Sequence, residues 1–132
     1  MRYRIIDNGF CFICGKRNPA GLQLTFEETE KGVSANFSLE RKYQGYEDII
    51  HGGVIAAILD EAMIKAANLR GLNAITAEIT IRFRNPLMVG QNAMVQGKVL
   101  KEERRIIKAQ AIIYKDDLVI AEAEGKLYVP VV

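Results

Sequence analysis

The fold is decided by residues 53–69, which read GVIAAILDEAMIKAANL. This segment is rich in alanine, leucine, isoleucine and methionine, and Asn68 and Gly71 mark its end. We therefore predict one long helix from Gly53 to Leu69, about 25 Å long at a rise of about 1.5 Å per residue. No other part of the sequence has this pattern, so we expect the helix to lie at the centre of the domain.

The rest of the chain has the pattern of β-strands. Strands of roughly ten residues are long, and they suit an antiparallel sheet that curves around the apolar helix. Two shorter strands before the helix are predicted to form a hairpin with its turn at Glu28 to Gly32. The fold class is therefore α+β. The predicted strands are Leu22 to Phe26, Val33 to Leu39, Ala74 to Arg84, Gln91 to Lys101, Arg105 to Tyr114 and Leu118 to Val129.

The composition is that of an ordinary globular protein. Hydrophobic residues make up 49% and charged residues 26% of the 132 residues, which suits a single domain over residues 1–132. The formal net charge of +2 does not favour a nucleic-acid partner. The most apolar segment is short for a membrane span and contains Asp60, Glu61 and Lys65, so we expect no membrane partner.

The N-terminal segment, residues 1–20, is predicted to be irregular because it contains Gly9, Gly15 and the pair Asn18-Pro19. Its first residues, Met1 to Asp7, lack the apolar stretch of a signal peptide. We therefore expect a cytoplasmic location, where cysteines are normally reduced.

Asp60 is the polar residue that the helix pattern does not explain. Glu61, Lys65 and Asn68 share one polar stripe of the predicted helix, whereas Asp60 lies on the apolar side with Gly53. Removing a carboxylate from water is costly unless a partner compensates it. Asp60 either bonds to a neighbouring backbone or arginine, or it is a general base or nucleophile with a tuned pKa. We favour the second interpretation.

The turn before the helix strengthens that interpretation. His51-Gly52-Gly53 leads directly into the helix, where the first backbone N–H groups have no intrahelical partner and attract negative charge. Glycine lets a ligand approach the backbone closely. Such donors can hold the oxyanion that forms when a thioester carbonyl is attacked.

These residues also resemble a known family. Residues 51–62, HGGVIAAILDEA, resemble the central-helix motif of hotdog-fold acyl-CoA thioesterases, and most closely the group of the phenylacetate-pathway thioesterases. The resemblance extends over most of the chain. Residues 11–22, CFICGKRNPAGL, are similar to the N-terminal segment of one branch, and residues 80–86, TIRFRNP, are similar to the strand after the helix.

The resemblance implies a curved antiparallel sheet wrapped around one long central helix. It also implies homodimers, often paired into homotetramers, with the acyl-CoA site between subunits. The catalytic acid of the family then corresponds to Asp60, its oxyanion amide to Gly52 and its turn residue to His51. Coenzyme A is part of the substrate, so no separate cofactor is expected.

Several residues are candidates for substrate binding. Related enzymes often carry an amide side chain six residues before the histidine, where this chain has Gly45, and the adjacent Gln44 is our candidate for that role. Tyr43, Tyr46 and Phe83 are candidates for lining the acyl pocket, although aromatic residues at such spacings are often simply core. Gly53 is a candidate for shaping the turn that contacts the substrate. Arg82, Arg84 and Lys108 are either contacts for the CoA phosphates or, equally well, solvated residues on strand faces.

The single histidine and the two cysteines are given structural roles. Cys11 and Cys14 form a Cys-x-x-Cys pair, but a structural zinc site takes four ligands and the chain has only these two cysteines and His51. We therefore predict no metal, although a site shared between subunits stays open. For His51 we favour a bond to the loop or backbone over proton transfer.

The leading hypothesis is hydrolysis of an acyl-CoA thioester to a free acid and CoA. A hydratase or dehydratase acting on CoA-linked or carrier-linked acyl chains is the second, and it would make His51 essential. The third is a non-catalytic domain that binds acyl-CoA, since fold does not determine function.

Overall fold

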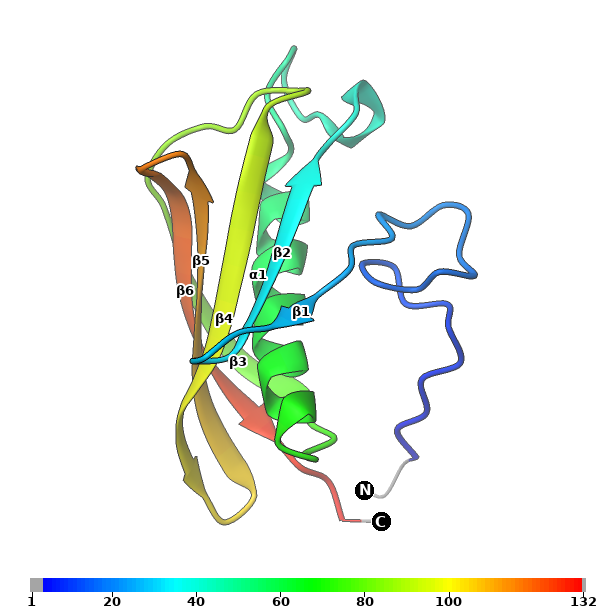
Figure 1. The fold of residues 1–132 in the computed structure, drawn as a ribbon, viewed down its shortest axis with the longest axis vertical. Coiled ribbons are helices and arrows are strands. Elements are labelled where there is room, and N and C mark those ends of the chain that lie inside the picture. The colour runs from blue at the N-terminus through cyan, green and yellow to red at the C-terminus, as the bar shows by residue number, and fades with distance from the viewer. Residues whose placement is uncertain (1–3, 132) are drawn as a thin grey trace.

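Residues 4–131 are described by the computed structural model, in which one helix packs against one sheet. The six strands are antiparallel and follow the spatial order β1-β2-β4-β5-β6-β3. Figure 1 shows the long strands curving across one side of α1, with the N-terminal segment on the other side. The elements are β1 (Glu27–Glu28), β2 (Val33–Ser38), the 3-10 turn η1 (Arg41–Tyr43), α1 (Gly52–Leu69), β3 (Ile75–Phe83), β4 (Asn92–Glu103), β5 (Ile106–Lys115) and β6 (Leu118–Tyr128).

Most of the predicted elements are confirmed. The helix begins one residue earlier than predicted, at Gly52, and ends at Leu69 as predicted. The four strands after the helix lie within two residues of their predicted bounds. The curved sheet around one helix is the hotdog arrangement that the resemblance implied. The segment from residue 4 to residue 20 is irregular, and residues 1–3 lie outside the described part of the chain.

The predicted strand Leu22 to Phe26 is wrong. The first strand is only Glu27–Glu28, which pairs with the start of β2. Gln23 has a φ of 53°, a left-handed backbone conformation that interrupts an extended strand. The amides of Leu22 and Leu24 instead donate to the carbonyls of Phe12 and Ile13, each at 2.9 Å. This segment therefore pairs with the N-terminal residues rather than with the sheet.

The core lies between α1 and the concave face of the sheet. Ile58, Leu59 and Met63 of α1 have no exposed surface, and neither do their counterparts on β4 and β5, such as Val95 and Ile113. Period-two alternation along β4 and β5 directs these side chains to α1 and their neighbours to the opposite face.

Gly97 sets how closely the helix approaches β4. A Cβ at Gly97 would lie 2.4 Å from the carbonyl oxygen of Ala62, so a larger residue would push α1 away from the sheet. This close packing sets the distance between the sheet and the middle of α1, which carries Asp60 and Glu61.

Two strand edges limit the sheet. β1 is very short, but β3 is nine residues long and pairs only with β6. An edge strand of this length presents unpaired backbone groups to a second chain. Within residues 4–131, no helix combines the length and the apolar character needed to cross a membrane.

Candidate active site

Asp60 is half-buried in the middle of α1, and within residues 4–131 its carboxylate has one hydrogen-bond partner. The hydroxyl of Thr76, at the start of β3, donates to Oδ1 of Asp60. The strand register shifts between Thr76 and Glu78, so a β-bulge lies directly beside this contact. Bulges often re-aim a side chain next to a functional site. The helix and the edge strand together therefore fix the orientation of the carboxylate.

The environment of Asp60 raises its pKa. Burial is the largest cause because it disfavours the charged form, and the negative charge of Glu61 acts in the same direction. The hydrogen bond from Thr76 lowers the pKa and only partly compensates. A carboxyl group with a raised pKa and an oriented oxygen suits a general base near neutral pH.

His51 is the N-cap of α1. Its Nδ1 accepts the N–H of Gly53 at 2.8 Å, and its carbonyl oxygen accepts the N–H groups of Val54 and Ile55. This arrangement supports the structural role that we favoured for His51. It also means that the Gly53 amide is already used within the chain.

The Gly52 amide differs from that of Gly53. Across residues 4–131, the Gly52 N–H donates no hydrogen bond. This N–H belongs to the first residue of α1, where the helix dipole favours negative charge. This N–H is therefore available to donate a hydrogen bond to an anion.

An open groove of about 320 Å³ runs past Gly52. The ring of Phe83 packs over the glycine, since a Cβ placed on Gly52 would meet Cε1 of Phe83 at 3.6 Å. Phe83 is 58% exposed, so its ring is free to contact a ligand. Arg84 also lines the groove, although its guanidinium pairs with Glu122 at 3.1 Å.

The other residues predicted to bind substrate do not line the groove at Gly52. Oε1 of Gln44 accepts the N–H of Asp48 at 3.0 Å and so closes the loop rather than pointing to the Gly52 amide. Tyr46 is 88% exposed on the same loop and contributes nothing to the groove. Tyr43 is half-buried and packs against the core. Arg82 on β3 and Lys108 on β5 are exposed, and neither lines the groove.

Asp60 and Gly52 of one chain are too far apart to act on the same carbonyl. They are eight residues apart on one straight helix, which separates them by about 12 Å along its axis. A base and an oxyanion donor must each lie within about 3 Å of the reacting group. The two residues can therefore serve one substrate only if they come from different chains.

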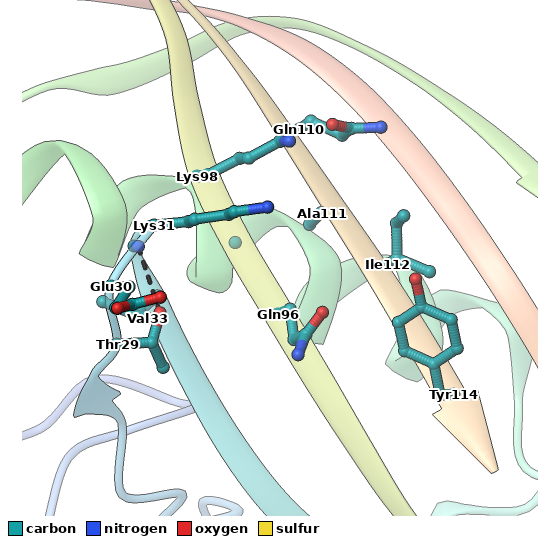
Figure 2. A pocket seen from close by; sticks show the side chains of 12 residues that line it. Thr29, Glu30, Lys31, Val33, Gln96, Lys98, Gln110, Ala111, Ile112 and Tyr114 are labelled. Carbon is teal, nitrogen blue, oxygen red and sulfur yellow. Dashed lines mark hydrogen bonds between the residues drawn. The ribbon is translucent and has the colours of Figure 1, made fainter. Parts of the chain in front are cut away.

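A larger hollow than the groove at Gly52 lies elsewhere. A hollow of about 500 Å³ lies on the sheet face opposite α1, between the β1–β2 turn and strands β4 and β5. Figure 2 shows Lys31 and Lys98 extending over it, with Tyr114 at one end. It shares no lining residue with the groove at Gly52. Its position gives no access to Asp60, so we do not assign the chemistry to it.

Comparison with known proteins connects this geometry to a family. Residues 47–122 match the family described as the thioesterase superfamily. The chain belongs to this superfamily. The matched region contains α1, its N-terminal turn and strands β3 to β5, and therefore both Asp60 and the Gly52 amide.

The chain is also similar to individual thioesterases. The mouse acyl-coenzyme A thioesterase THEM5 is 30% identical over 102 residues, which cover 76% of this chain and 41% of the mouse protein. The human THEM5 is 28% identical over 126 residues, covering 90% of this chain and 51% of the human protein. The chain thus spans about half the length of the curated relatives that it matches. A crystallised thioesterase superfamily protein is 27% identical, with a TM-score of 0.86 over 98% of this chain and 68% of its own.

A hypothetical thioesterase of Streptococcus pneumoniae has the same fold. Its structure with coenzyme A has a TM-score of 0.76 and 14% identity, over 80% of this chain and 87% of that protein. Structures of that protein are also known with an aspartate or a threonine replaced by alanine.

The sequence did not predict the contacts of two residues near the candidate site, Thr76 and Glu61. Thr76 gives no signal of its own in the sequence, because threonine is common in strands and its contact to Asp60 spans the helix–strand connection. Glu61 was assigned to a solvated stripe with Lys65. Its carboxylate instead accepts a hydrogen bond from the thiol of Cys11 at 2.9 Å, which brings the Cys-x-x-Cys turn against α1.

Proposed function

We propose that this chain hydrolyses acyl-CoA thioesters to a free acid and CoA. Asp60 acts as general base on water or as nucleophile on the thioester carbonyl, and the Gly52 amide stabilises the oxyanion. The observation that carries the proposal is the half-buried carboxylate of Asp60, held by Thr76 in a superfamily whose curated members include acyl-CoA thioesterases.

The S. pneumoniae thioesterase supports the choice of residues. The aspartate and threonine replaced in that protein are separated by 16 positions, and Asp60 and Thr76 have the same separation. That protein binds coenzyme A, which is the leaving group of the proposed reaction.

The proposal includes a homo-oligomer. The long free edge of β3 suits pairing with the same strand of a second copy, and the distance between Asp60 and Gly52 within one chain requires two chains per site. In a twofold dimer, each site then combines Asp60 of one protomer with Gly52 of its partner. The groove beside Phe83 is the proposed place for the acyl group.

The hydratase alternative needs a histidine that exchanges protons with the substrate. Nδ1 of His51 is engaged as the cap of α1, and no observation favours that chemistry here.

The test is hydrolysis of a panel of aromatic, medium-chain and branched acyl-CoA esters, followed by detection of the free thiol. Replacement Asp60→Asn keeps the size and an acceptor for Thr76 but removes the base. We expect kcat to fall by about 10²- to 10⁴-fold. Glu102→Gln, which removes an exposed carboxylate on β4, is the matched control. Near-normal turnover by Asp60→Asn would overturn the assignment.

A further inference from the structure

The N-terminal segment meets α1 at a cluster of two thiols and a carboxylate. The sulfur atoms of Cys11 and Cys14 and a carboxylate oxygen of Glu61 all lie within 4.8 Å of one another. All three residues are half-buried rather than sealed in the core. None of the three has a direct part in the proposed hydrolysis, although the charge of Glu61 helps to raise the pKa of Asp60.

The turn that carries the two cysteines is built around one sulfur. The N–H groups of Ile13 and Cys14 both point at Sγ of Cys11, at 3.4 Å each. The Gly15 amide closes the turn on the Cys11 carbonyl at 2.9 Å, and a Cβ on Gly15 would lie only 2.4 Å from the Cys11 backbone nitrogen. Two amides directed at one sulfur stabilise it best when that sulfur is a thiolate.

We propose that Cys11, Cys14 and Glu61 bind a zinc ion, which fastens the N-terminal segment to the central helix. Zinc takes thiolate and carboxylate ligands in a tetrahedron, and the spacing Cys-x-x-Cys is one that it uses. Zn–S bonds of about 2.3 Å place two ligand sulfurs about 3.8 Å apart, so the cluster needs only a small contraction. The protein supplies three ligands rather than the four of a typical structural zinc site, and water completes the fourth position.

The charge around the cluster suits this ion. Two thiolates and one carboxylate carry three negative charges against the two positive charges of zinc. The ammonium group of Lys65 lies near enough to interact with both Cys14 and Glu61, and it balances the remaining charge. Charged and hydrogen-bonding groups around the ligands hold such sites in place.

The fold gives the ion a structural task. Residues 4–24 form no strand, and the sheet begins only at Glu27. Two ligands come from this segment and the third from the middle of α1, so one ion joins the segment to the central helix. The sequence-based expectation of no metal considered only the two cysteines and His51, and the fold adds Glu61 as a third candidate ligand.

The experiment is titration of the reduced, metal-free protein with zinc and with cobalt(II), with metal content measured by mass spectrometry. We expect one ion per chain with a Kd below about 1 μM, and a sulfur-to-cobalt charge-transfer band. Glu61→Gln keeps both thiols and should weaken binding by more than about tenfold. Cys14→Ser should abolish the band.

Glu78→Gln serves as the control and should bind like the wild type, and circular dichroism of each variant checks folding. Failure of the reduced protein to bind either metal overturns the proposal, as does binding that Glu61→Gln leaves unchanged. A protein that forms only a Cys11–Cys14 disulfide and takes up no metal after reduction overturns it too. The outcome is independent of the proposed hydrolysis, because it is measured without substrate.

Discussion

Asp60 is placed where its charged form is disfavoured. Burial and the neighbouring Glu61 both raise its pKa, and the hydroxyl of Thr76 is the single contact that opposes them. A solvated aspartate loses its proton far below neutral pH. The raised pKa moves the change of protonation state toward the range in which a general base is most effective.

Replacing Thr76 should shift the pH dependence of hydrolysis. Thr76→Val keeps the shape of the side chain but removes the hydrogen bond that lowers the pKa of Asp60, so the pKa rises further. The acid limb of the kcat profile should move to higher pH, because the base must be deprotonated to act. Thr80→Val on the same strand is the control and should leave the profile in place. An unchanged pH profile in Thr76→Val would mean that the Thr76 hydroxyl does not affect the pKa of the base.

The same pKa shift predicts a pH-dependent effect on stability. Above the ordinary value of 3.8, the unfolded chain releases the proton of Asp60 while the folded protein still holds it. Folding stability therefore falls as pH rises from 3.8 to the raised folded pKa, and the loss persists at higher pH. Asp60→Asn removes this titration. Its Tm relative to wild type should increase between pH about 3 and pH about 7, as measured by calorimetry. A difference independent of pH would contradict the assignment of the shift to this residue.

At the scale of elements, α1 determines most of the site. Its first residue supplies the free amide, its middle supplies Asp60 and Glu61, and Gly97 of β4 lets it lie close to the sheet. A substitution that shifts α1 moves all of these groups together, because they belong to one helix. The N-cap His51 determines where α1 begins.

Loss of the cap should affect stability more than chemistry. His51→Ala removes the acceptor of the Gly53 N–H and should cost about 0.5–2 kcal/mol in the free energy of unfolding. His51→Asn restores a good cap without an imidazole, and should recover both Tm and kcat. Denaturation and thiol-release assays check both effects. A His51→Asn variant that is stable but inactive would instead favour proton transfer by the histidine.

At the scale of the whole molecule, the composite site can be tested by complementation. Gly52→Pro removes the N–H, but proline is well tolerated at the first residue of a helix, and the extended conformation of His51 suits a following proline. Gly52→Ala keeps the N–H and is the control. Each of Asp60→Asn and Gly52→Pro should be inactive alone.

Co-refolding the two inactive variants should restore activity. In each mixed dimer one site has both wild-type groups and the other has neither. Random pairing places half of the chains in mixed dimers, so about a quarter of the wild-type activity should return. No recovery in verified mixed dimers would mean that both groups act from one chain.

Much of this arrangement can be read from the sequence. The composition of residues 53–69 predicts the helix, and alternation predicts the four long strands after it, because both patterns depend on local periodicity. Asp60 stands out because a carboxylate on the apolar side of a helix breaks the pattern. Leu22 to Phe26 was misassigned for a related reason. Its apolar residues fit a strand, but a left-handed Gln23 and pairing with the N-terminal segment decide its conformation.

The sequence by itself determined the helix, the long strands and the acidic residue within the helix, since near neighbours in the chain specify them. Only the tertiary structure decided which residues meet Asp60 and Glu61. Thr76 is 16 residues from Asp60, and Cys11 is 50 residues from Glu61. Contacts over such separations depend on how the helix packs between the edge strand and the N-terminal segment, and side-chain periodicity carries no record of that packing.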